Sequence, residues 1–486
     1  CLPRAKLLGV ACTLLDVDED AAEMALDDLL AGEELVSHTF EGEEYLFLPW
    51  LYRAERYTAS RLQMLLQFPP RSGVVLEDEI DRIEKEQGIE YEERQRQAIR
   101  AAVEQGLLIL TGGPGTGKTT TLKAIIDIMS RQELKIALAA PTGRAAKRLQ
   151  ELTGYEAKTI HRLLEVEFTD NERSQFGRHE KNPLDCDAVI VDELSMVDSL
   201  LFESLLRAMR LGCRLILVGD ADQLPSVGAG NVLGDLLAAG CLPQVRLTRI
   251  FRQSMQSLIV TNAHRIVAGE MPELGRKDGD FFLLTEPNPV RAARLVAELV
   301  AERLPKAYGF SPLHDIQLLC PSRKMELGTA SMNQRLQQMI NPPGPGKAEY
   351  RRGNALLRVG DKVMQMKNNY DILWTKDNGE DGSGVFNGDI GILLAADLRT
   401  GTLSVRYDDR IALYTEADAQ DLELAYAATV HKSQGSEYTC VVLPVIGAPP
   451  QLCYRNLLYT AVTRAKKLLV MVGSAEAVAG MVQNNK

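Results

Sequence analysis

Short, entirely apolar runs alternate with helix-like stretches through most of the chain. A first set of such runs lies at 107–110, 136–139, 188–191 and 215–218. A second set lies at 316–319, 440–443 and 468–472. Runs this short, with apolar residues facing both ways, are typical of strands buried on both faces of a parallel sheet. The pattern therefore predicts an α/β chain with two similar lobes, each built on a parallel sheet.

The stretch from about 348 to 425 follows a different pattern. Its segments 358–364, 385–391 and 402–407 are rich in β-forming residues and are punctuated by turns. Such spacing predicts short strands joined by tight connections. Because this stretch lies between two runs of the second set, we expect a small β-barrel inserted in the second lobe.

The first 70 residues are predicted to form a separate module. Apolar positions in 21–31 share one helical face, with Asp20 as the expected N-cap. Residues 35–48 contain two strand-like runs around a Glu-Gly turn, and a helix followed by a hairpin resembles a winged helix. The predicted domains are a winged-helix-like acidic module at 1–70, a first lobe at 71–250 with a hairpin insertion at about 164–184, and a second lobe at 251–486.

Charge is distributed unevenly along the chain. The whole sequence carries a net charge of −11, and residues 1–60 alone contain 13 acidic against 4 basic side chains. The rest of the chain is therefore close to neutral, and phosphate binding depends on local clusters of positive charge rather than on the total. The net charge therefore does not exclude a groove that binds nucleic acid. We interpret the acidic module as a protein-contact surface, with DNA contact as the alternative.

Composition also limits where the chain is expected to work. No stretch approaches the ~18 consecutive apolar residues of a membrane span. The eight cysteines are scattered and never form Cys-x-x-Cys, which argues against a zinc ribbon or a disulfide framework and favours a reducing, cytoplasmic location. The sequence opens Cys-Leu-Pro-Arg, without an initiator Met or a signal peptide, so we expect it to be a piece of a longer chain.

The most specific motif is a phosphate-binding loop between an apolar run and a helix-like segment. The sequence Gly112-Gly-Pro-Gly-Thr-Gly-Lys-Thr119 matches G-x-x-x-x-G-K-[ST]. Glycines let the backbone approach phosphates, whose charge meets the N–H groups of the loop and the helix N-terminus. Lys118 is expected at the β- and γ-phosphates and Thr119 at Mg²⁺. The predicted nucleotide-binding residues of this loop are Gly112, Gly113, Pro114, Gly115, Thr116, Gly117, Lys118, Thr119 and Thr120.

Two further strand ends supply the groups that nucleotide hydrolysis needs. The run at 188–191 leads into Asp192, suited to hold Mg²⁺, with Glu193 beside it as the candidate general base. The run at 215–218 leads to Gln223, which is placed to sense the γ-phosphate or orient water. Ligands bind at the carboxyl ends of parallel strands, so these side chains are expected at one edge of one sheet. The implied cofactors are ATP and Mg²⁺.

Later segments complete an ordered set of motifs. They are Gly219-Asp-Ala-Asp-Gln-Leu-Pro-Ser-Val-Gly228, Leu247-Thr-Arg-Ile-Phe-Arg-Gln253, Ala428-Thr-Val-His-Lys-Ser-Gln-Gly-Ser-Glu437 and Tyr459-Thr-Ala-Val-Thr-Arg-Ala-Lys466. In this order the motifs resemble those of superfamily 1 helicases, and most of all the RecD-like 5′-to-3′ DNA helicases. The resemblance covers about residues 90–475. It implies two RecA-like lobes, with a Src-homology-3-type barrel inside the second.

The resemblance implies roles for matching residues around the nucleotide. Arg252 and Arg464 would be arginine fingers that reach the γ-phosphate from the second lobe. Gln95 would contact the adenine, with Gln97 as the alternative if the motif is displaced. The implied catalytic residues are Lys118, Glu193, Gln223, Arg252 and Arg464.

The resemblance also implies contacts to a DNA strand. Hydroxyl, amide and backbone N–H groups suit sequence-independent phosphate contacts, which a translocating enzyme requires. The implied DNA-binding residues are Pro141, Thr142, Arg144, Thr159, His161, Asn387, Thr429, His431 and Ser433. For the two histidines a structural role remains the alternative.

The expected function is ATP-dependent 5′-to-3′ translocation on single-stranded DNA, with unwinding of the duplex ahead, in DNA repair or recombination. The expected partners are single-stranded DNA and duplex with a 5′ tail. The hairpin near 164–184 would be a strand-separating pin or a plain surface hairpin. Three other functions stay open: a motor subunit of a RecBCD-type helicase–nuclease complex, a nucleotide-gated clamp on single-stranded DNA, and the helicase domain of a conjugative relaxase. Relaxase chemistry needs a tyrosine and a histidine cluster, and the six dispersed histidines argue against it.

Overall fold

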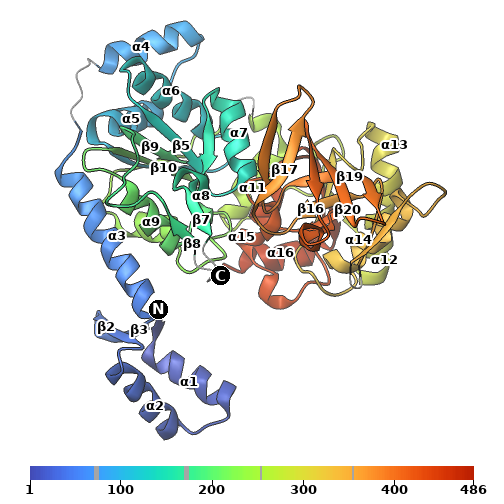
Figure 1. The fold of residues 1–486 in the computed structure, drawn as a ribbon, viewed down its shortest axis with the longest axis horizontal. Helices are drawn as coiled ribbons and strands as arrows, with labels where there is room; N and C mark the ends of the chain where they lie inside the picture. Colours follow the sequence, from blue (N-terminus) through green and yellow to red (C-terminus); the bar gives the residue numbers. More distant parts are fainter. Residues whose placement is uncertain (71–75, 169–173, 252–253, 353–354, 486) are drawn as a thin grey trace.

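The computed structural model of the chain describes residues 1–486 except 71–75, 169–173, 252–253, 353–354 and 486. Two parallel sheets form its two main bodies, and an antiparallel sheet lies beside them (Figure 1). A small N-terminal module stands apart at the end of a long helix. The predicted α/β class with parallel sheets is confirmed.

The first parallel sheet has the strand order β11-β4-β10-β9-β5-β6. Its strands are β4 (Leu107–Gly112), β5 (Ile136–Ala140), β6 (Ala157–Thr159), β9 (Ala188–Val191), β10 (Arg214–Gly219) and β11 (Gln244–Leu247). Every neighbouring pair is parallel. The four central strands are the predicted apolar runs, whereas β6 and β11 were not predicted. Both lie at the sheet edges, and β11 alternates exposed and buried residues instead of forming an unbroken apolar run.

Helices cover both faces of the first sheet. They are α4 (Leu76–Gln87), α5 (Glu93–Arg100), α6 (Lys118–Arg131), α7 (Gly143–Thr153), α8 (Ile160–Leu163), α9 (Ser199–Ala208) and α10 (Val232–Ala239). Leu108 and Leu110 of β4 pack in one core with α4, α5 and α6. Leu107 and Ile109 pack in the opposite core with α8, α9 and α10. Strand side chains alternate between faces, so each central strand packs in both cores, which fixes the position of its carboxyl end.

The second parallel sheet has the strand order β12-β25-β24-β13-β23. Its strands are β12 (Phe281–Thr285), β13 (Ile316–Cys320), β23 (Ala427–Thr429), β24 (Tyr438–Pro444) and β25 (Ala465–Gly473). Its helices are α11 (Leu258–Val267), α12 (Pro289–Glu298), α13 (Leu304–Tyr308), α14 (Thr329–Ile340), α15 (Arg455–Val462) and α16 (Ala475–Gln483). Helices α11, α15 and α16 share one core with the sheet, and α12, α13 and α14 share the other. All neighbouring strands are parallel.

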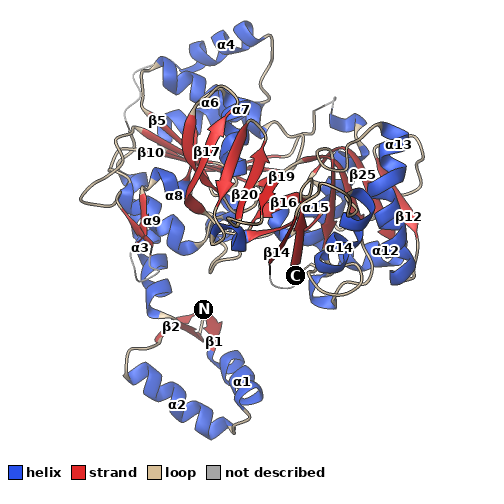
Figure 2. Cartoon of the chain, turned by 45° about the vertical axis from the view of Figure 1, so that its right-hand side comes forward, coloured by secondary structure: helices blue, strands red, loops and turns tan. Residues whose placement is uncertain are grey.

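The inserted sheet follows β13 and α14 in the chain. A hairpin of β14 (Glu349–Arg352) and β15 (Ala355–Arg358) leads into it. The order β18-β17-β21-β20-β19-β16-β22 is formed by β16 (Lys362–Gln365), β17 (Asn369–Lys376), β18 (Asp381–Val385), β19 (Ile390–Asp397), β20 (Thr402–Tyr407), β21 (Arg410–Tyr414) and β22 (Leu422–Leu424). Figure 2 shows these strands coming forward at the junction of the two parallel sheets. The insertion encloses an apolar core of its own, which includes Val363, Leu393, Val405 and Tyr414.

The N-terminal module contains two helices and a small antiparallel sheet. Its elements are β1 (Leu2–Pro3), α1 (Arg4–Leu15), α2 (Glu19–Ala31), β2 (Val36–Phe40) and β3 (Glu43–Phe47). The predicted N-cap Asp20 is wrong. Asp18 caps α2, because its side chain accepts the Ala21 N–H at 2.7 Å, and the helix therefore begins before residue 21.

Helix α3 (Pro49–Gln67) joins the module to the first sheet. Near its start, the Tyr52 ring lies edge-on to Phe47 of β3, with ring centroids 5.2 Å apart. Toward its end, Leu62 and Leu65 are buried in the core beside α9. The helix is therefore anchored in both bodies.

A hairpin lies at the predicted insertion between α8 and β9. Strands β7 (Val166–Phe168) and β8 (Ser174–Phe176) pair antiparallel. The tip of the hairpin falls at 169–173, outside the described residues. Across the part of the chain that is described, no helix has both the length and the apolarity needed to cross a lipid bilayer.

Candidate functional site

A cleft of about 760 Å³ opens where the carboxyl ends of the first sheet's strands face the second sheet. The predicted nucleotide-binding residues Gln95 and 113–120 all line it. Gly112 lies just behind them at the end of β4. The second sheet's side of the cleft supplies Ser254, Glu437, Thr463 and Arg464. The cleft, called the main cleft below, therefore has walls from both halves of the chain.

The phosphate-binding loop forms one wall of the main cleft. Gly115 and Gly117 have φ values of +73° and +85°, a left-handed conformation that favours glycine. A Cβ atom at Gly117 would lie only 2.5 Å from Gln95 Nε2, so the loop also needs the missing side chain. The Lys118 ammonium donates to the carbonyl oxygens of Gly112 and Gly113. These bonds hold the positive charge inside the curve of the loop.

The acidic pair lies at the end of β9, on another wall of the cleft. The Glu193 N–H donates to Asp192 Oδ1 at 2.8 Å. Glu193 has φ +55°, a sparsely populated conformation for a side chain of this kind. Burial first, and then the charge of Glu193, raise the pKa of Asp192 to about 6. Thr119 lines the same cleft, and hydroxyl and carboxylate oxygens of this kind fit a bound Mg²⁺.

Gln223 and Arg464 meet across the two halves of the chain. Arg464 is 2% exposed, and its Nη2 donates to Gln223 Oε1 at 2.9 Å. Two further guanidinium N–H groups donate to the carbonyl oxygens of Thr460 and Ser436, each at 3.2 Å. The guanidinium is thus fixed at the edge of the main cleft. Arg252, the other predicted arginine finger, lies outside the described residues.

The first turn of α5 separates the two candidate glutamines. Gln95 is 2% exposed, and its Nε2 donates to the carbonyl oxygen of Gly117 in the phosphate loop at 3.4 Å. Its Oε1 accepts the Glu92 N–H at 3.0 Å, which completes a capping box. Gln97 is exposed. Gln95 is therefore the glutamine that the fold holds against the loop.

A second hollow, of about 740 Å³, runs between the first sheet, the second sheet and the insertion. We call it the groove. Five of the predicted DNA-binding residues line it: Thr142, Arg144, Asn387, Thr429 and His431. Asn387 Oδ1 accepts from Lys432 Nζ at 2.7 Å, which adds a cation to this wall. Residues that are far apart in the sequence thus gather in one groove.

Three other predicted DNA-binding side chains are engaged within the fold. Thr159 accepts the Arg162 N–H at 3.1 Å as the N-cap of α8. Ser433 is fully buried, and its hydroxyl donates to the Val430 carbonyl at 2.7 Å. His161 lies against the Phe176 ring at 6.0 Å, and burial lowers its pKa. These side chains and Pro141 are outside the lining of the groove. Burial also lowers the pKa of His431.

Comparison with known proteins identifies the family. A family model described as an AAA domain matches residues 95–229, one for the ATP-dependent RecD-like DNA helicase SH3 domain matches 332–407, and one for a UvrD-like helicase C-terminal domain matches 424–472. The RecBCD enzyme subunit RecD of Mycolicibacterium smegmatis is 32% identical over 96% of this chain and 84% of its own length. The chain belongs to the RecD family of DNA helicases.

The ATP-dependent RecD2 DNA helicase of Deinococcus radiodurans is 38% identical over 96% of this RecD-family chain. The chain spans 60% of the length of that relative. A solved structure, the Pif1 helicase from Bacteroides in complex with ADP-AlF3 and ssDNA, resembles it with a TM-score of 0.47 and 19% identity, covering 79% of this chain and 92% of the Pif1 chain. The SH3 domain that the sequence predicted inside the second half is confirmed by its family model.

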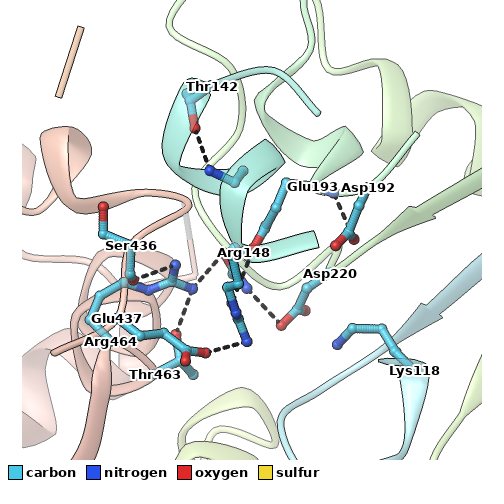
Figure 3. A network of polar contacts seen from close by, with 12 residues as sticks. Lys118, Thr142, Arg148, Asp192, Glu193, Asp220, Ser436, Glu437, Thr463 and Arg464 are labelled. Atoms are coloured by element: carbon cyan, nitrogen blue, oxygen red, sulfur yellow. Dashed lines mark hydrogen bonds and ion pairs between the residues drawn. The ribbon is translucent and has the colours of Figure 1, made fainter. Parts of the chain in front are cut away.

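Sequence reasoning missed Arg148, which connects the two halves of this RecD-family chain. Figure 3 shows its guanidinium between Glu193 of the first half and Glu437 of the second. The distances are 3.9 Å to Glu193 Oε1 and 2.5 Å to Glu437 Oε1. Arg148 lies one helical turn after Arg144 on α7, and that i, i+4 spacing was the available signal.

Tyr459 begins one of the sequence motifs, but sequence reasoning gave it no role. Its hydroxyl donates to Asp220 Oδ2 at 2.6 Å, and Gln223 Nε2 donates to the same oxygen at 3.2 Å. Burial and the Asp220 charge raise the pKa of Tyr459 well above its ordinary value, so the phenol remains a donor. The loop after β10 is therefore fastened to α15 of the other half.

Proposed function

We propose that this chain is the motor of an ATP-dependent DNA helicase that moves 5′ to 3′ on single-stranded DNA and unwinds the duplex ahead. The observation that carries the proposal is the contact of Arg464 with Gln223 beside the phosphate loop. That contact links the half that would bind ATP to the half that would sense it. The 5′-to-3′ direction rests on the family to which the chain belongs.

In the nucleotide reaction, the loop N–H groups and Lys118 would bind the ATP phosphates, while Gln95 would contact the adenine. Thr119 and Asp192 would hold Mg²⁺, which neutralises phosphate charge when it is bound. Glu193 would accept the proton of the attacking water, and Gln223 would orient that water. Arg464, together with Arg252, would stabilise the charge that develops on the γ-phosphate.

We further propose the predicted domain organisation for these sites. Residues 71–250 and 251–486 would be two RecA-like lobes, 348–425 a β-barrel inserted in the second, and 1–70 a winged-helix-like module. DNA would lie in the groove, where polar side chains from both lobes and the insertion meet. Closure of the lobes on ATP and their release after hydrolysis would alternate the grip on the strand. The hairpin of β7 and β8 would then act as the strand-separating pin.

A second candidate is a motor subunit of a RecBCD-type complex. It is supported by the match to the mycobacterial RecD subunit over 84% of that protein. In this case the acidic N-terminal module would be a protein-contact surface. Either function places the chain in the cytoplasm with its DNA substrate.

The test measures the ATPase rate with and without single-stranded DNA, together with unwinding of partial duplexes that carry a 5′ or a 3′ tail. Stimulation by DNA with unwinding only from the 5′ tail supports the stand-alone helicase. Stimulation without unwinding favours the subunit of a complex. Absence of stimulation contradicts both and leaves the nucleotide-gated clamp.

A further inference from the structure

A third hollow, of about 400 Å³, lies where α7, the inserted sheet and the segment between β23 and β24 meet. We call it the basic pocket, because six lysine and arginine side chains line it against three carboxylates. The six are Arg144, Lys147, Arg148, Lys362, Arg406 and Lys466. An excess of cations in a recess marks a place where an anion is favoured.

Four of the six cations are already paired with carboxylates. Lys147 contacts Asp408 at 2.5 Å, and Arg406 contacts Asp377 at 3.0 Å. Both Arg148 and Lys466 contact Glu437, at 2.5 and 3.3 Å. Within the described residues, Arg144 and Lys362 have no carboxylate at ion-pair distance. The unpaired positive charge of the basic pocket therefore comes from Arg144 and Lys362.

Lys362 is a costly residue to bury. It is 3% exposed, and its Nζ donates to the Ile316 carbonyl oxygen at 3.0 Å. Burial first, and then the charge of Arg144, lower the pKa of Lys362 to about 7. The charge of Asp315 acts in the opposite direction, but Asp315 forms no ion pair with Lys362. A buried ammonium without a paired carboxylate is unfavourable, and a bound anion would reduce that penalty.

Arg144 presents its guanidinium to the same pocket. It donates to Ser436 Oγ at 3.0 Å and to the Tyr438 hydroxyl at 3.4 Å, and it lies over the Tyr438 ring at 6.0 Å. Those partners are neutral. A planar guanidinium beside an ammonium is the donor set that suits a phosphate group, because the first offers paired N–H donors and the second a compact charge.

The basic pocket adjoins both sites already described. It shares Arg148 and Glu437 with the main cleft, and Arg144 and Ser436 with the groove. We propose that Arg144 and Lys362 bind one phosphate group there, separate from the phosphates held by the loop of Lys118. The phosphate would be either a phosphodiester of bound DNA or the orthophosphate released by hydrolysis. The site itself goes beyond the proposed function, and only the source of the phosphate rests on it.

Such a phosphate would connect two parts of the chain that move independently if the lobes open. Arg144 belongs to α7 beside the first sheet, whereas Lys362 begins β16 of the insertion and is hydrogen-bonded to β13 of the second sheet. An anion between them would hold the insertion against α7. Its departure would weaken that contact.

The test measures orthophosphate binding to the whole chain while the main cleft is filled with a non-hydrolysable ATP analogue and Mg²⁺. We expect the chain to bind phosphate under these conditions. Lys362→Met and, separately, Arg144→Gln should each weaken this binding roughly tenfold or more, as expected for one charge-assisted hydrogen bond. The matched control is Lys376→Met, which removes a lysine of the same sheet that pairs with Glu380 and leaves the pocket intact.

Affinity for the ATP analogue and the thermal midpoint report whether each variant is folded, and two independent substitutions keep the proposal testable if one of them fails. No phosphate binding to the wild-type chain, or binding that neither substitution weakens, overturns the proposal. The measurement requires neither hydrolysis nor unwinding, so its failure is distinct from a failure of the proposed function.

Two further measurements identify the source of the phosphate. If it is a DNA phosphodiester, single-stranded DNA displaces orthophosphate, and Lys362→Met reduces the salt slope of DNA affinity by about one phosphate. If it is the hydrolysis product, DNA leaves orthophosphate binding unchanged, and Lys362→Met alters the rate of phosphate release in a single turnover.

Discussion

The two parallel sheets share one layered architecture but differ in the segments that connect their strands. In the first sheet, strand ends lead directly into the phosphate loop, the Asp192–Glu193 pair and Gln223. In the second sheet, the polypeptide between β13 and β23 contains the whole insertion, and Arg464 comes after α15. The scaffold is therefore alike in both halves, and the chemistry is set by the connections. In the proposed function, the first half would bind a nucleotide and the second would respond to it.

The largest expected effect is that of Lys118→Ala on ATP turnover, which tests the role proposed for the first half. Loss of the loop's cation should reduce ATP turnover to background. Single-stranded DNA affinity should stay within about threefold, since Lys118 is outside the lining of the groove proposed for DNA. Steady-state ATPase and fluorescence anisotropy with labelled DNA measure the two. Lys123→Ala, at an exposed position on the same helix, is the control. An equal loss of DNA binding would show that the substitution disturbs the fold.

Arg464→Ala tests the contribution of the second half. Removing the guanidinium should lower kcat for ATP by about 10³-fold, the usual size of an arginine-finger effect. Nucleotide affinity should change much less, because the loop and Lys118 remain. Equilibrium binding of a labelled ATP analogue separates the two quantities. Arg276→Ala, which removes a surface arginine paired with Asp278, provides the comparison; a similar loss of kcat there would contradict the assigned role.

The salt dependence of DNA binding tests whether the groove between the two halves binds DNA phosphates. A strand held by about five phosphates should lose about 10²-fold in affinity between about 50 and 200 mM salt. Anisotropy titrations at several salt concentrations give the slope. A flat dependence would mean that the polar residues gathered between the two sheets do not bind the phosphate backbone.

The smallest effect is expected from Lys362→Met on thermal stability. The pKa of Lys362 is about 7 in the folded chain, below its ordinary value of 10.5, so the unfolded chain binds more protons between these pH values. The cost to folding therefore grows as the pH falls from 10.5 toward 7. The substitution should raise the thermal midpoint by roughly 2–4 °C near pH 7 and by less near pH 10. A gain that is the same at both pH values would contradict the buried charge.

The fold was predictable where local pattern alone decides it. Central strands such as β4 and β9 are short apolar runs because both of their faces are covered. Helix α1 was missed because Leu8 is its only buried residue, so it shows no continuous apolar face. Edge strand β11 was missed because it pairs with β4, which is distant in the sequence. The N-cap of α2 was assigned to Asp20 rather than Asp18, because the acidic segment 16–20 offers several equivalent caps.

The site residues, like the fold, were predictable only where a local motif contains them. The phosphate loop and the Asp192–Glu193 pair are contiguous motifs, so their residues were found directly. Contacts that join the halves, such as that of Arg148 with Glu437 and of Tyr459 with Asp220, involve positions more than 200 residues apart. Pairing at such a distance leaves no local signature. Lys362 was overlooked for a similar reason, since only the folded chain shows that it is buried.

Helix α3 is a continuous connection between the N-terminal module and the first sheet. Its 19 residues form a rod about 28 Å long, with one end in edge-on ring contact with the module and the other packed beside α9. Helix α9 begins shortly after the acidic pair, and its cap residue Asp198 lines the groove. If the chain acts as proposed, a force on the N-terminal module would be transmitted along α3 to α9, and so to the groove.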